Sequence, residues 1–248
     1  MRVKGAVHIH SALSGDGTMT IAEIAQFYRQ RNYHFIALTD HAEDLDADAV
    51  EILKRDSRDN SDSHFCIIPG LEFSAHAQLH ILGLGVTELL PQDNRLAVID
   101  QIHSRGGLAI LAHPRRLGWN CPAGILRAID GVEIWNVGYD GKFLPSARAL
   151  GGFAEMRQVN PRLLAVAGHD FHRRESFYDV GLEMDVAKLS AEAILEILRG
   201  GHYRIRSRFF QTVPDARISP AKAAYLRMIG GQLRNLRRAR SFGLGWFS

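Results

Sequence analysis

The sequence predicts an α/β fold built around a parallel sheet. Short apolar runs typical of buried strands alternate with segments that have helical spacing and helix caps. The chain of 248 residues is long enough to form one large domain. In addition, His, Asp and Glu residues stand at or just after the ends of several apolar runs. Because parallel strands end on the same side of a barrel, these residues are expected to lie close together.

The elements of the first part of the chain are marked by spacing and caps. His8 and His10 stand two residues apart in an apolar run, so a strand would place both imidazoles on one face. Thr20 and Glu23 form a capping box before a segment with helical spacing. The expected elements are a strand (2–10), a Gly- and Ser-rich loop (13–17), a helix (21–31), a strand (35–38) that ends in Thr39-Asp40-His41, and a helix (46–59).

The middle and last parts continue the alternation. The apolar runs here are continuous, as in strands that are buried on both faces, and Gly106-Gly107 closes one of the helices. Ser219-Pro220 offers an N-cap and a first-turn proline for a last helix, which Gly230-Gly231 would interrupt. The expected strands are 65–68, 70–73, 80–84, 108–112, 131–135, 163–167 and 203–205, and the expected helices are 94–105, 146–159 and 190–198.

Composition is ordinary for a soluble globular protein, with 46% hydrophobic and 23% charged residues. The longest apolar runs are far short of a membrane span, and the first residues show no signal-peptide pattern. Cys66 and Cys121 are the only cysteines and lie far apart, which excludes a disulfide framework. We therefore expect a cytoplasmic protein.

Charge is distributed unevenly along the chain. Residues 199–248 carry eleven Lys or Arg and one acid, Asp215, whereas the other 198 residues carry 19 basic and 26 acidic residues. We expect a barrel at 1–200 and a basic C-terminal helical segment at 201–248. Leu226, Ile229, Leu233 and Leu236 recur there at helical spacing among arginines, so the segment either packs on the barrel or a subunit or binds nucleic acid or a membrane surface.

Residues at the strand ends are of the types that bind divalent metals. They are imidazoles and carboxylates without a thiolate, a set that suits hard or borderline cations. Each alone has a structural explanation; Asp40, for example, could be a helix cap. Their joint occurrence favours a metal site. The residues are His8, His10, Asp40, His41, Glu72, His113, Asp170 and His172.

The ordered motifs resemble those of the PHP (polymerase and histidinol phosphatase) superfamily. They span residues 8 to 172, about two thirds of the chain, and their order is far more specific than any one of them. The strand Gly131-Val132-Glu133-Ile134-Trp135-Asn136 is also similar to one in that family. The motifs are His8-Ile9-His10, Asp16, Thr39-Asp40-His41, Gly70-Leu71-Glu72, His80-Ile81-Leu82-Gly83, Ala112-His113-Pro114 and Gly168-His169-Asp170-Phe171-His172.

This resemblance implies a distorted (β/α)7 barrel and two or three divalent metal ions (Zn, Mn or Fe). The implied ligands of one metal are His8, His10, Glu72 and Asp170. Those of the second are Asp16, His41 and His172. Glu72 would bridge to a third metal with His80 and His113. His76 is an alternative to His80.

Two departures from the family pattern bear on the site. His169 stands where the family usually has a small residue, so it could support the ligands or face the core. Only thirty residues separate His41 from Glu72, which leaves no room for the inserted domain of some family members. Any cap over the substrate must therefore be small.

The metal cluster that the resemblance implies suits hydrolysis of a phosphate ester, because the cations would activate water and neutralise the phosphoryl oxygens. Arg115 and Arg116 follow His113-Pro114 and are candidate phosphate-binding residues. Lys142, Arg173 and Arg174 are further cations on loops. His169 and Asp16 are candidates for the general acid. The aromatic residues that could stack on a nucleobase are Tyr139, Trp119 and Trp135.

The leading functional prediction is thus a metal-dependent phosphoesterase for a small phosphomonoester such as a nucleotide. A 3′-to-5′ exonuclease and a histidinol phosphatase are the enzymatic alternatives that the family implies, and the basic tail favours the former. A regulatory module without activity is the non-enzymatic alternative, and the complete set of nine implied ligands disfavours it.

Overall fold

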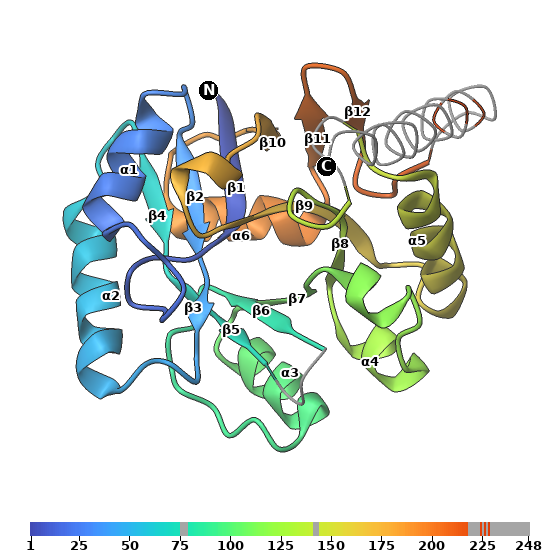
Figure 1. The fold of residues 1–248 in the computed structure, drawn as a ribbon, viewed down its shortest axis with the longest axis horizontal. Coiled ribbons are helices and arrows are strands. Elements are labelled where there is room, and N and C mark those ends of the chain that lie inside the picture. Colours follow the sequence, from blue (N-terminus) through green and yellow to red (C-terminus); the bar gives the residue numbers. More distant parts are fainter. Residues whose placement is uncertain (75–78, 141–143, 218–223, 225, 227, 229–248) are drawn as a thin grey trace, which may run out of the picture.

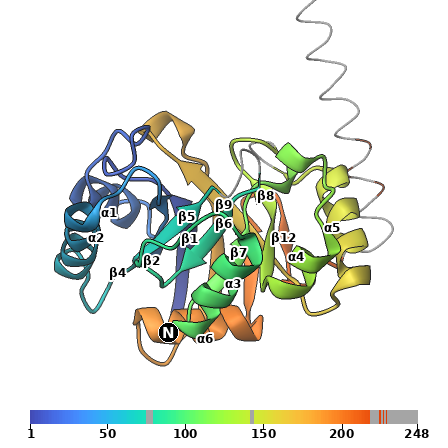
Figure 2. The same ribbon diagram turned by 90° about the horizontal axis from the view of Figure 1, so that it is seen from below.

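The protein has a mixed α/β fold in which helices flank one large sheet. The computed structural model describes residues 1–74, 79–140, 144–217, 224, 226 and 228. Figure 1 shows α1 and α2 on one side of the strands and α4 and α5 on the other. Figure 2, turned by 90°, keeps the sheet between these two pairs of helices. The α-helices of the described residues are α1 (Ile21–Arg29), α2 (Ala47–Asp59), α3 (Arg95–Ser104), α4 (Ala123–Ala128), α5 (Ala147–Val159) and α6 (Ala191–Gly200).

Twelve strands form the sheet of the described residues. They follow the predicted alternation closely, and two short 3-10 helices, η1 (Pro114–Leu117) and η2 (Arg174–Ser176), lie directly after β7 and β9. The strands are β1 (Arg2–Ile9), β2 (Phe35–Leu38), β3 (Asp40–His41), β4 (Cys66–Ile68), β5 (Gly70–Phe73), β6 (Ile81–Leu84), β7 (Leu108–Leu111), β8 (Gly131–Asn136), β9 (Leu164–Phe171), β10 (Val180–Asp185), β11 (Tyr203–Ser207) and β12 (Gln211–Thr212).

The sheet is not a closed ring of hydrogen-bonded strands. Its order is β12-β11-β10-β1-β9-β8-β7-β6-β5-β3, while β2 pairs with β1 and β4. Thr39 separates β2 from β3, and Pro69, which has no N–H to donate, separates β4 from β5. The ladder from β1 to β4 therefore does not continue into the ladder of β3 with β5. The seven-stranded barrel implied by the resemblance remains a prediction.

The sheet is also not wholly parallel, contrary to our expectation. β6 is antiparallel to both β5 and β7, and β10 is antiparallel to β1. The start of β6 therefore lies beside the ends of β5 and β7, so His80, which precedes β6, is on the same side as the residues that follow parallel strands. The antiparallel direction of β6 thus places His80 beside the residues at the ends of the parallel strands.

Helix caps confirm most of the predicted helix starts. The hydroxyl of Thr20 accepts a hydrogen bond from the Glu23 N–H (3.3 Å), and the Glu23 carboxylate accepts one from the Thr20 N–H (2.9 Å). The residues at the predicted starts of four further helices also accept hydrogen bonds from their own first turns and so act as N-caps; they are Asp46, Asn94, Ser146 and Ser190. The helix α1 ends at Arg29 rather than at residue 31.

Several elements of the described residues were not predicted: the helix α4, the strands β10 and β12, and the two 3-10 helices. The helix α4 has only six residues, too few to show a helical period, and the sequence between 172 and 190 was assigned no strand, although β10 lies there. The short strand expected at 203–205 is present as β11 and pairs with β10. The last helix, expected from Ser219 onward, lies almost entirely outside the described residues. The helices among the described residues are too short or too polar to cross a membrane.

The core lies between the sheet and the helices, and it fixes the strands whose ends carry the polar residues. The strands β2, β5, β6, β7 and β8 are buried at every position. The largest fully buried side chains are Trp135, Tyr28, Phe35, Phe65, Phe73, Phe153 and Phe171.

Candidate metal centre

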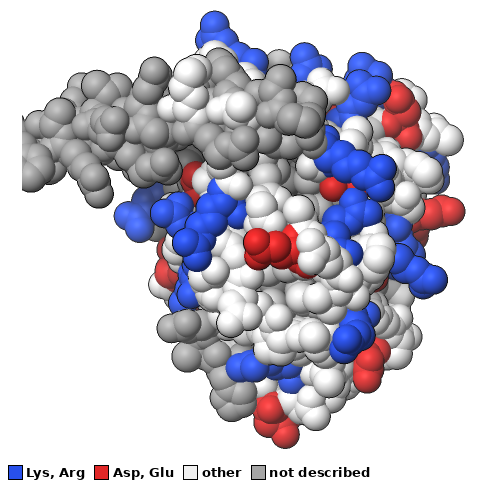
Figure 3. Space-filling model, turned by 90° about the vertical axis from the view of Figure 1, so that its right-hand side faces the viewer, with Lys and Arg blue, Asp and Glu red and all other residues white. Residues whose placement is uncertain are grey.

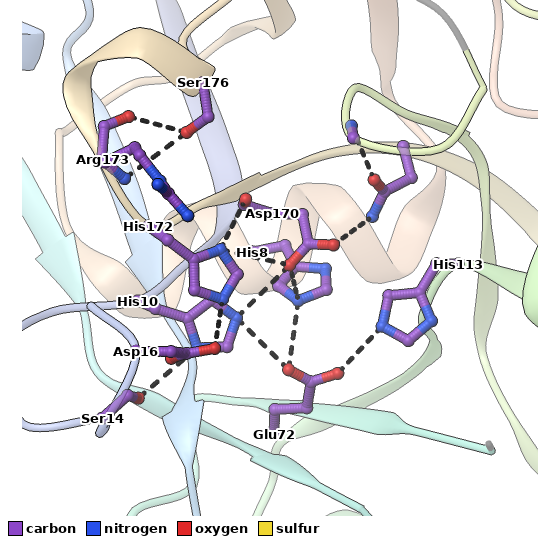
Figure 4. A network of polar contacts seen from close by, with 12 residues as sticks. His8, His10, Ser14, Asp16, Glu72, His113, Asp170, His172, Arg173 and Ser176 are labelled. Atoms are coloured by element: carbon purple, nitrogen blue, oxygen red, sulfur yellow. Dashed lines mark hydrogen bonds and ion pairs between the residues drawn. The ribbon is translucent and has the colours of Figure 1, made fainter. Parts of the chain in front are cut away.

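Glu72 of β5 is at the centre of the cluster and is 1% exposed. Its Oε1 atom lies 2.6 Å from Nδ1 of His80 and 3.2 Å from Nε2 of His113. Its Oε2 atom lies 3.2 Å from Nε2 of His8 and 3.3 Å from Nε2 of His10. Nδ1 of His41 is 3.4 Å from the same oxygen. One buried carboxylate therefore faces five imidazoles (Figure 4 draws three of them).

Asp170 of β9 supplies the second buried carboxylate. Its Oδ1 atom lies 3.3 Å from Nε2 of His8 and 3.6 Å from Nε2 of His10. The same oxygen is 3.8 Å from Nδ1 of His172. Its Oδ2 atom accepts a hydrogen bond from the Asn136 side chain (3.4 Å). As Figure 4 shows, Asp170 and Glu72 approach His8 and His10 from opposite sides.

The outer part of the cluster contains Asp16, His41 and His172. Oδ2 of Asp16 lies 2.9 Å from Nε2 of His172 and 3.5 Å from Nε2 of His41. The Asp16 side chain is 54% exposed, so solvent reaches the cluster here. The rings of His10 and His172 are stacked, with centroids 4.3 Å apart.

All nine predicted ligands are brought together by the fold. Their nitrogen and oxygen atoms fall into overlapping groups within which all ligand atoms lie within 4.8 Å of one another. Nε2 of His10 and Nδ1 of His41 are buried and make no hydrogen bond, although a Glu72 oxygen lies 3.3 and 3.4 Å away. Converging donors with unused lone pairs fit divalent cations. The groups are His10, Asp16, His41 and His172; His8, His10 and Glu72; His8, His113 and Asp170; and Glu72, His80 and His113.

The electrostatics of the cluster are those of a site that attracts cations. Burial opposes charge on every one of these groups. Nevertheless, contacts with Asp170 and Glu72 raise the pKa of His10 to about 9, and the charges of Glu133, Asp170 and Glu72 raise the pKa of His8. The charge of His8 and the hydrogen bonds from neighbouring histidines together outweigh burial and lower the pKa values of Glu72 and Asp170. Without metal, protons on the imidazoles balance the carboxylates, and a bound cation would replace them.

Three of the predicted ligands have a left-handed backbone. The φ angles are 65° at His8, 28° at His113 and 49° at Asp170, a region that residues other than glycine rarely adopt. The register of β1 with β2 and β9 shifts around His8, as at a β-bulge. The bulge leaves the His8 and His10 rings side by side, with centroids 5.1 Å apart. Such strain is typical of functional sites.

Asp40 supports the loop that carries Asp16. Its carboxylate accepts hydrogen bonds from the Ser11 N–H (2.6 Å), the Ser11 hydroxyl (2.9 Å) and the Ser14 hydroxyl (2.8 Å). The Ser14 oxygen accepts the N–H of His41 (2.9 Å). The sequence marks Asp40 as a strand-end residue of the metal-binding type and as a possible helix cap, but Asp40 is in none of the ligand groups. Its partners show that it organises the loop after β1 instead.

Glu133 is the polar residue that the sequence reasoning missed. It is fully buried in β8 and lies 2.7 Å from Nδ1 of His8. The signal was present: Glu133 is an acid in the middle of an apolar run. A carboxylate in a continuously buried strand needs specific partners. The position of those partners could not be read from the sequence.

The two candidate phosphate-binding arginines have different surroundings. Nη1 of Arg116 lies 3.4 Å from Nε2 of His80, so its guanidinium borders the cluster. Arg115 instead donates a hydrogen bond to the carbonyl oxygen of Tyr139, and its Nη1 lies 3.9 Å from a carboxylate oxygen of Asp140. Arg115 therefore ties η1 to the loop after β8.

The structure does not bring His169 to the cluster. Successive residues of a strand point to opposite faces, so His169 of β9 points away from the side of Asp170. Its Nδ1 lies 2.7 Å from the Tyr28 hydroxyl and its Nε2 lies 2.5 Å from the carbonyl oxygen of Val180. Burial lowers the pKa of His169 to about 4. This placement agrees with a side chain that faces the core and gives no support to His169 as general acid.

Among the aromatic candidates, only Tyr139 is available at the cluster. Trp135 is fully buried and Trp119 is 7% exposed, whereas Tyr139 is 40% exposed. The Tyr139 and His113 ring centroids are 5.2 Å apart. Of the loop cations, Arg174 lies over the Phe27 ring. Lys142 and His76 lie outside the described residues.

Comparison with solved structures finds proteins that have a similar fold. No family model matches the sequence, and no curated protein matches it. A structure described as a two-domain protein from Bacteroides vulgatus containing a predicted PHP-like metal-dependent phosphoesterase matches 83% of this chain with a TM-score of 0.63 and 15% identity. The lesion-specific endonuclease EndoQ from Pyrococcus furiosus matches 83% of the chain with a TM-score of 0.60 and 16% identity.

The chain spans less than two thirds of either of these proteins: 65% of the first and 58% of the second. At these identities the likeness concerns the fold. The expectation drawn from the ordered motifs is confirmed at that level: the chain shares its fold with a protein described as containing a predicted PHP-like metal-dependent phosphoesterase.

Proposed function

We propose that the protein is a metal-dependent phosphoesterase, with the nine clustered side chains as ligands of two or three divalent metal ions. The observation that carries the proposal is Glu72, which is buried among five imidazoles and can bridge two cations through its two oxygens. The fold neighbours named as a phosphoesterase and an endonuclease support the same reaction class.

The division of ligands that the resemblance implies agrees with the groups His8, His10 and Glu72 and Glu72, His80 and His113, whereas Asp170 is grouped with His8 and His113. One metal would be held by His8, His10, Glu72 and Asp170, and a second by Asp16, His41 and His172. A third would lie between Glu72, His80 and His113. The resemblance implies Zn²⁺, Mn²⁺ or Fe²⁺, and a set of imidazoles and carboxylates without thiolates is compatible with each of them.

Phosphate-ester hydrolysis would use the bound cations to lower the pKa of a water molecule and to neutralise the phosphoryl oxygens. Among the chain's own residues, Arg116 borders His80 and offers a guanidinium to a phosphoryl oxygen. Asp16 lies at the exposed edge, where it is able to hold or release a proton near the leaving group.

Tyr139 is a second candidate for contact with the substrate. Burial, followed by the charges of Asp170 and Glu72, raises the pKa of its hydroxyl, which therefore remains a hydrogen-bond donor at neutral pH. Its ring is also exposed enough to stack on a base. A nucleotide would use both properties, and this favours a small nucleotide over a phosphate ester without an aromatic group.

Nucleic acid ends form a second candidate substrate class. Figure 3 shows Lys and Arg side chains gathered on the face formed on the right-hand side of Figure 1. Residues 199–248 add eleven Lys or Arg against one acid. Basic surfaces of this kind attract polyanions.

The test is hydrolysis by metal-replete protein, measured as release of inorganic phosphate from phosphomonoesters and as shortening of labelled DNA strands. Nucleotides, histidinol phosphate and labelled single-stranded DNA would be offered with added Mn²⁺, Zn²⁺ or Fe²⁺. Turnover of one class, lost in His8→Ala and Asp170→Ala, would support the proposal. If wild-type protein with measured bound metal turned over none of these compounds, the protein would be better described as a regulatory module.

A further inference from the structure

Glu133 connects ligand residues from different parts of the site. Its Oε1 atom accepts a hydrogen bond from Nδ1 of His8 (2.7 Å). Its Oε2 atom accepts the backbone N–H of His113 (2.7 Å) and the side-chain amide of Asn136 (3.0 Å). Both oxygens are therefore used within the protein, and Glu133 belongs to none of the ligand groups.

We propose that Glu133 is a positioning residue that orients His8 and His113 toward the metal cluster; this inference rests on the proposed metal-dependent function. A proton on Nδ1 of His8, held by Glu133, leaves the Nε2 lone pair free. Nε2 lies 3.2 Å from the Glu72 carboxylate and 3.3 Å from the Asp170 carboxylate, so it faces the position of a cation between them. Carboxylates commonly orient metal-binding histidines in this way.

The contact with His113 concerns the backbone rather than the ring. His113 has a φ of 28°, which costs free energy for a residue with a side chain. The hydrogen bond from its N–H to Glu133 favours this conformation. The strained conformation in turn places Nε2 of His113 3.2 Å from Oε1 of Glu72.

Asn136 extends the same network to a third ligand. Its side-chain amide donates to Glu133 (3.0 Å) and approaches Oδ2 of Asp170 (3.4 Å). Through Asn136, Glu133 therefore also influences Asp170. Ligands from β1, β9 and the end of β7 depend on one carboxylate in β8.

A purely structural role is the alternative explanation, since any buried carboxylate that loses its partners destabilises a fold. Asp130 provides a matched control. It stands directly before β8, at the other end from Asn136, and its Oδ2 atom accepts from Nε2 of His103 (2.9 Å) and the N–H of Ala109 (2.8 Å). Like Glu133, it combines a histidine with a backbone N–H, but it does not contact the cluster.

The experiment compares Glu133→Gln with Asp130→Asn. Zn²⁺ affinity would be measured by calorimetry on the metal-stripped full chain, alongside the thermal unfolding midpoint. We expect Glu133→Gln to weaken Zn²⁺ binding by roughly 10–100-fold, because an amide cannot accept both the His8 and His113 hydrogens. Asp130→Asn should lower the unfolding midpoint without changing the Zn²⁺ affinity.

A second measurement needs no variant. In ¹⁵N-labelled, Zn²⁺-loaded wild-type protein, Nδ1 of His8 should carry a proton with a downfield resonance typical of a hydrogen bond to a carboxylate. Wild-type Zn²⁺ affinity in folded Glu133→Gln, or an unprotonated His8 Nδ1, would overturn the positioning role alone. Wild-type protein that bound neither Zn²⁺ nor Mn²⁺ would overturn the proposed function as well.

Discussion

Nδ1 of His80 lies 2.6 Å from Oε1 of Glu72, although the strand that follows His80 is antiparallel to the strand that contains Glu72. Glu72 is the third residue of β5, and His80 directly precedes β6. The reversal of β6 brings its start to the carboxyl end of β5. The site therefore draws ligands from the beginning of one strand as well as from the ends of parallel strands, and Glu72 is their common partner.

Replacing Glu72 should therefore abolish metal binding at the cluster. In Glu72→Gln, one neutral amide would face five imidazoles, and the bridge between cations would be lost. We expect the metal affinity to fall by more than the roughly 100-fold that loss of an outer partner costs, with loss of phosphoesterase activity. Metal content by mass spectrometry of the native protein measures this. Glu183→Gln, whose carboxylate pairs with Arg206 (3.1 Å) outside the cluster, should retain its metal.

Arg116 should contribute to substrate affinity. A hydrogen bond to a charged group is worth about 1.5–3 kcal/mol, so Arg116→Ala should raise KM by roughly ten- to hundredfold. kcat should change less if the guanidinium binds the phosphoryl group equally well before and during reaction. Steady-state kinetics with the best substrate would show this.

The control for Arg116 keeps the charge. Arg116→Lys should give an intermediate KM, because an ammonium lacks the planar fork of donors. Arg148→Ala, which removes a hydrogen bond to the Gly118 carbonyl (3.1 Å), should leave KM unchanged. An unchanged KM in Arg116→Ala would assign phosphate binding entirely to the metals.

The sequence predicted which side chains lie together better than it predicted the shape of the sheet that carries them. The strand ends could be found because apolar runs stop at polar residues, and the Thr20–Glu23 capping box could be found because both partners are local. The direction of β6 could not, since four apolar residues read the same in either direction. The left-handed backbone at His8 carries no local signal either, because it depends on pairing with β2 and β9.

Asp140 should make stability depend on pH. Its Oδ2 atom accepts the N–H of Asn136 (3.1 Å), but its Oδ1 atom is buried without a hydrogen bond. Burial raises the pKa of Asp140 from 3.8 to about 6. The folded protein therefore favours the protonated carboxyl group. The contribution of this preference to the free energy of unfolding is complete below pH 3.8 and is lost as the pH rises through about 6.

Asp140→Asn should accordingly be more stable than wild type above pH 6, by about 3 kcal/mol at most for a shift of two pKa units. The difference should vanish below about pH 4, where both side chains are neutral. Urea unfolding at a series of pH values measures it. A constant difference at all pH values would show that the titration of Asp140 is not responsible.

Variants of Tyr139 should distinguish a nucleotide substrate from other phosphate esters. If its ring stacks on a base, Tyr139→Phe should keep KM for a nucleoside monophosphate, and Tyr139→Ala should raise it roughly tenfold, since stacking is worth about 1–3 kcal/mol. Ribose 5-phosphate, which has no base, should be insensitive to both. A fall in kcat in Tyr139→Phe for both substrates would instead indicate that the hydroxyl acts on the leaving group.

Substitution of Gly168 should impair metal binding as strongly as substitution of a ligand, although Gly168 has no side chain. A Cβ atom at this position would overlap the carboxylate of Glu133 and lie 3.2 Å from Cβ of His8. Gly168→Ala would therefore displace Glu133 from His8, at an overpacking cost of about 1–3 kcal/mol. We expect weaker Zn²⁺ binding together with a lower unfolding midpoint.

Gly151→Ala in α5, where a Cβ meets no atom within 4 Å, is the matched control and should leave Zn²⁺ binding unchanged. Unaltered Zn²⁺ affinity in Gly168→Ala would mean that the cluster tolerates a displaced Glu133.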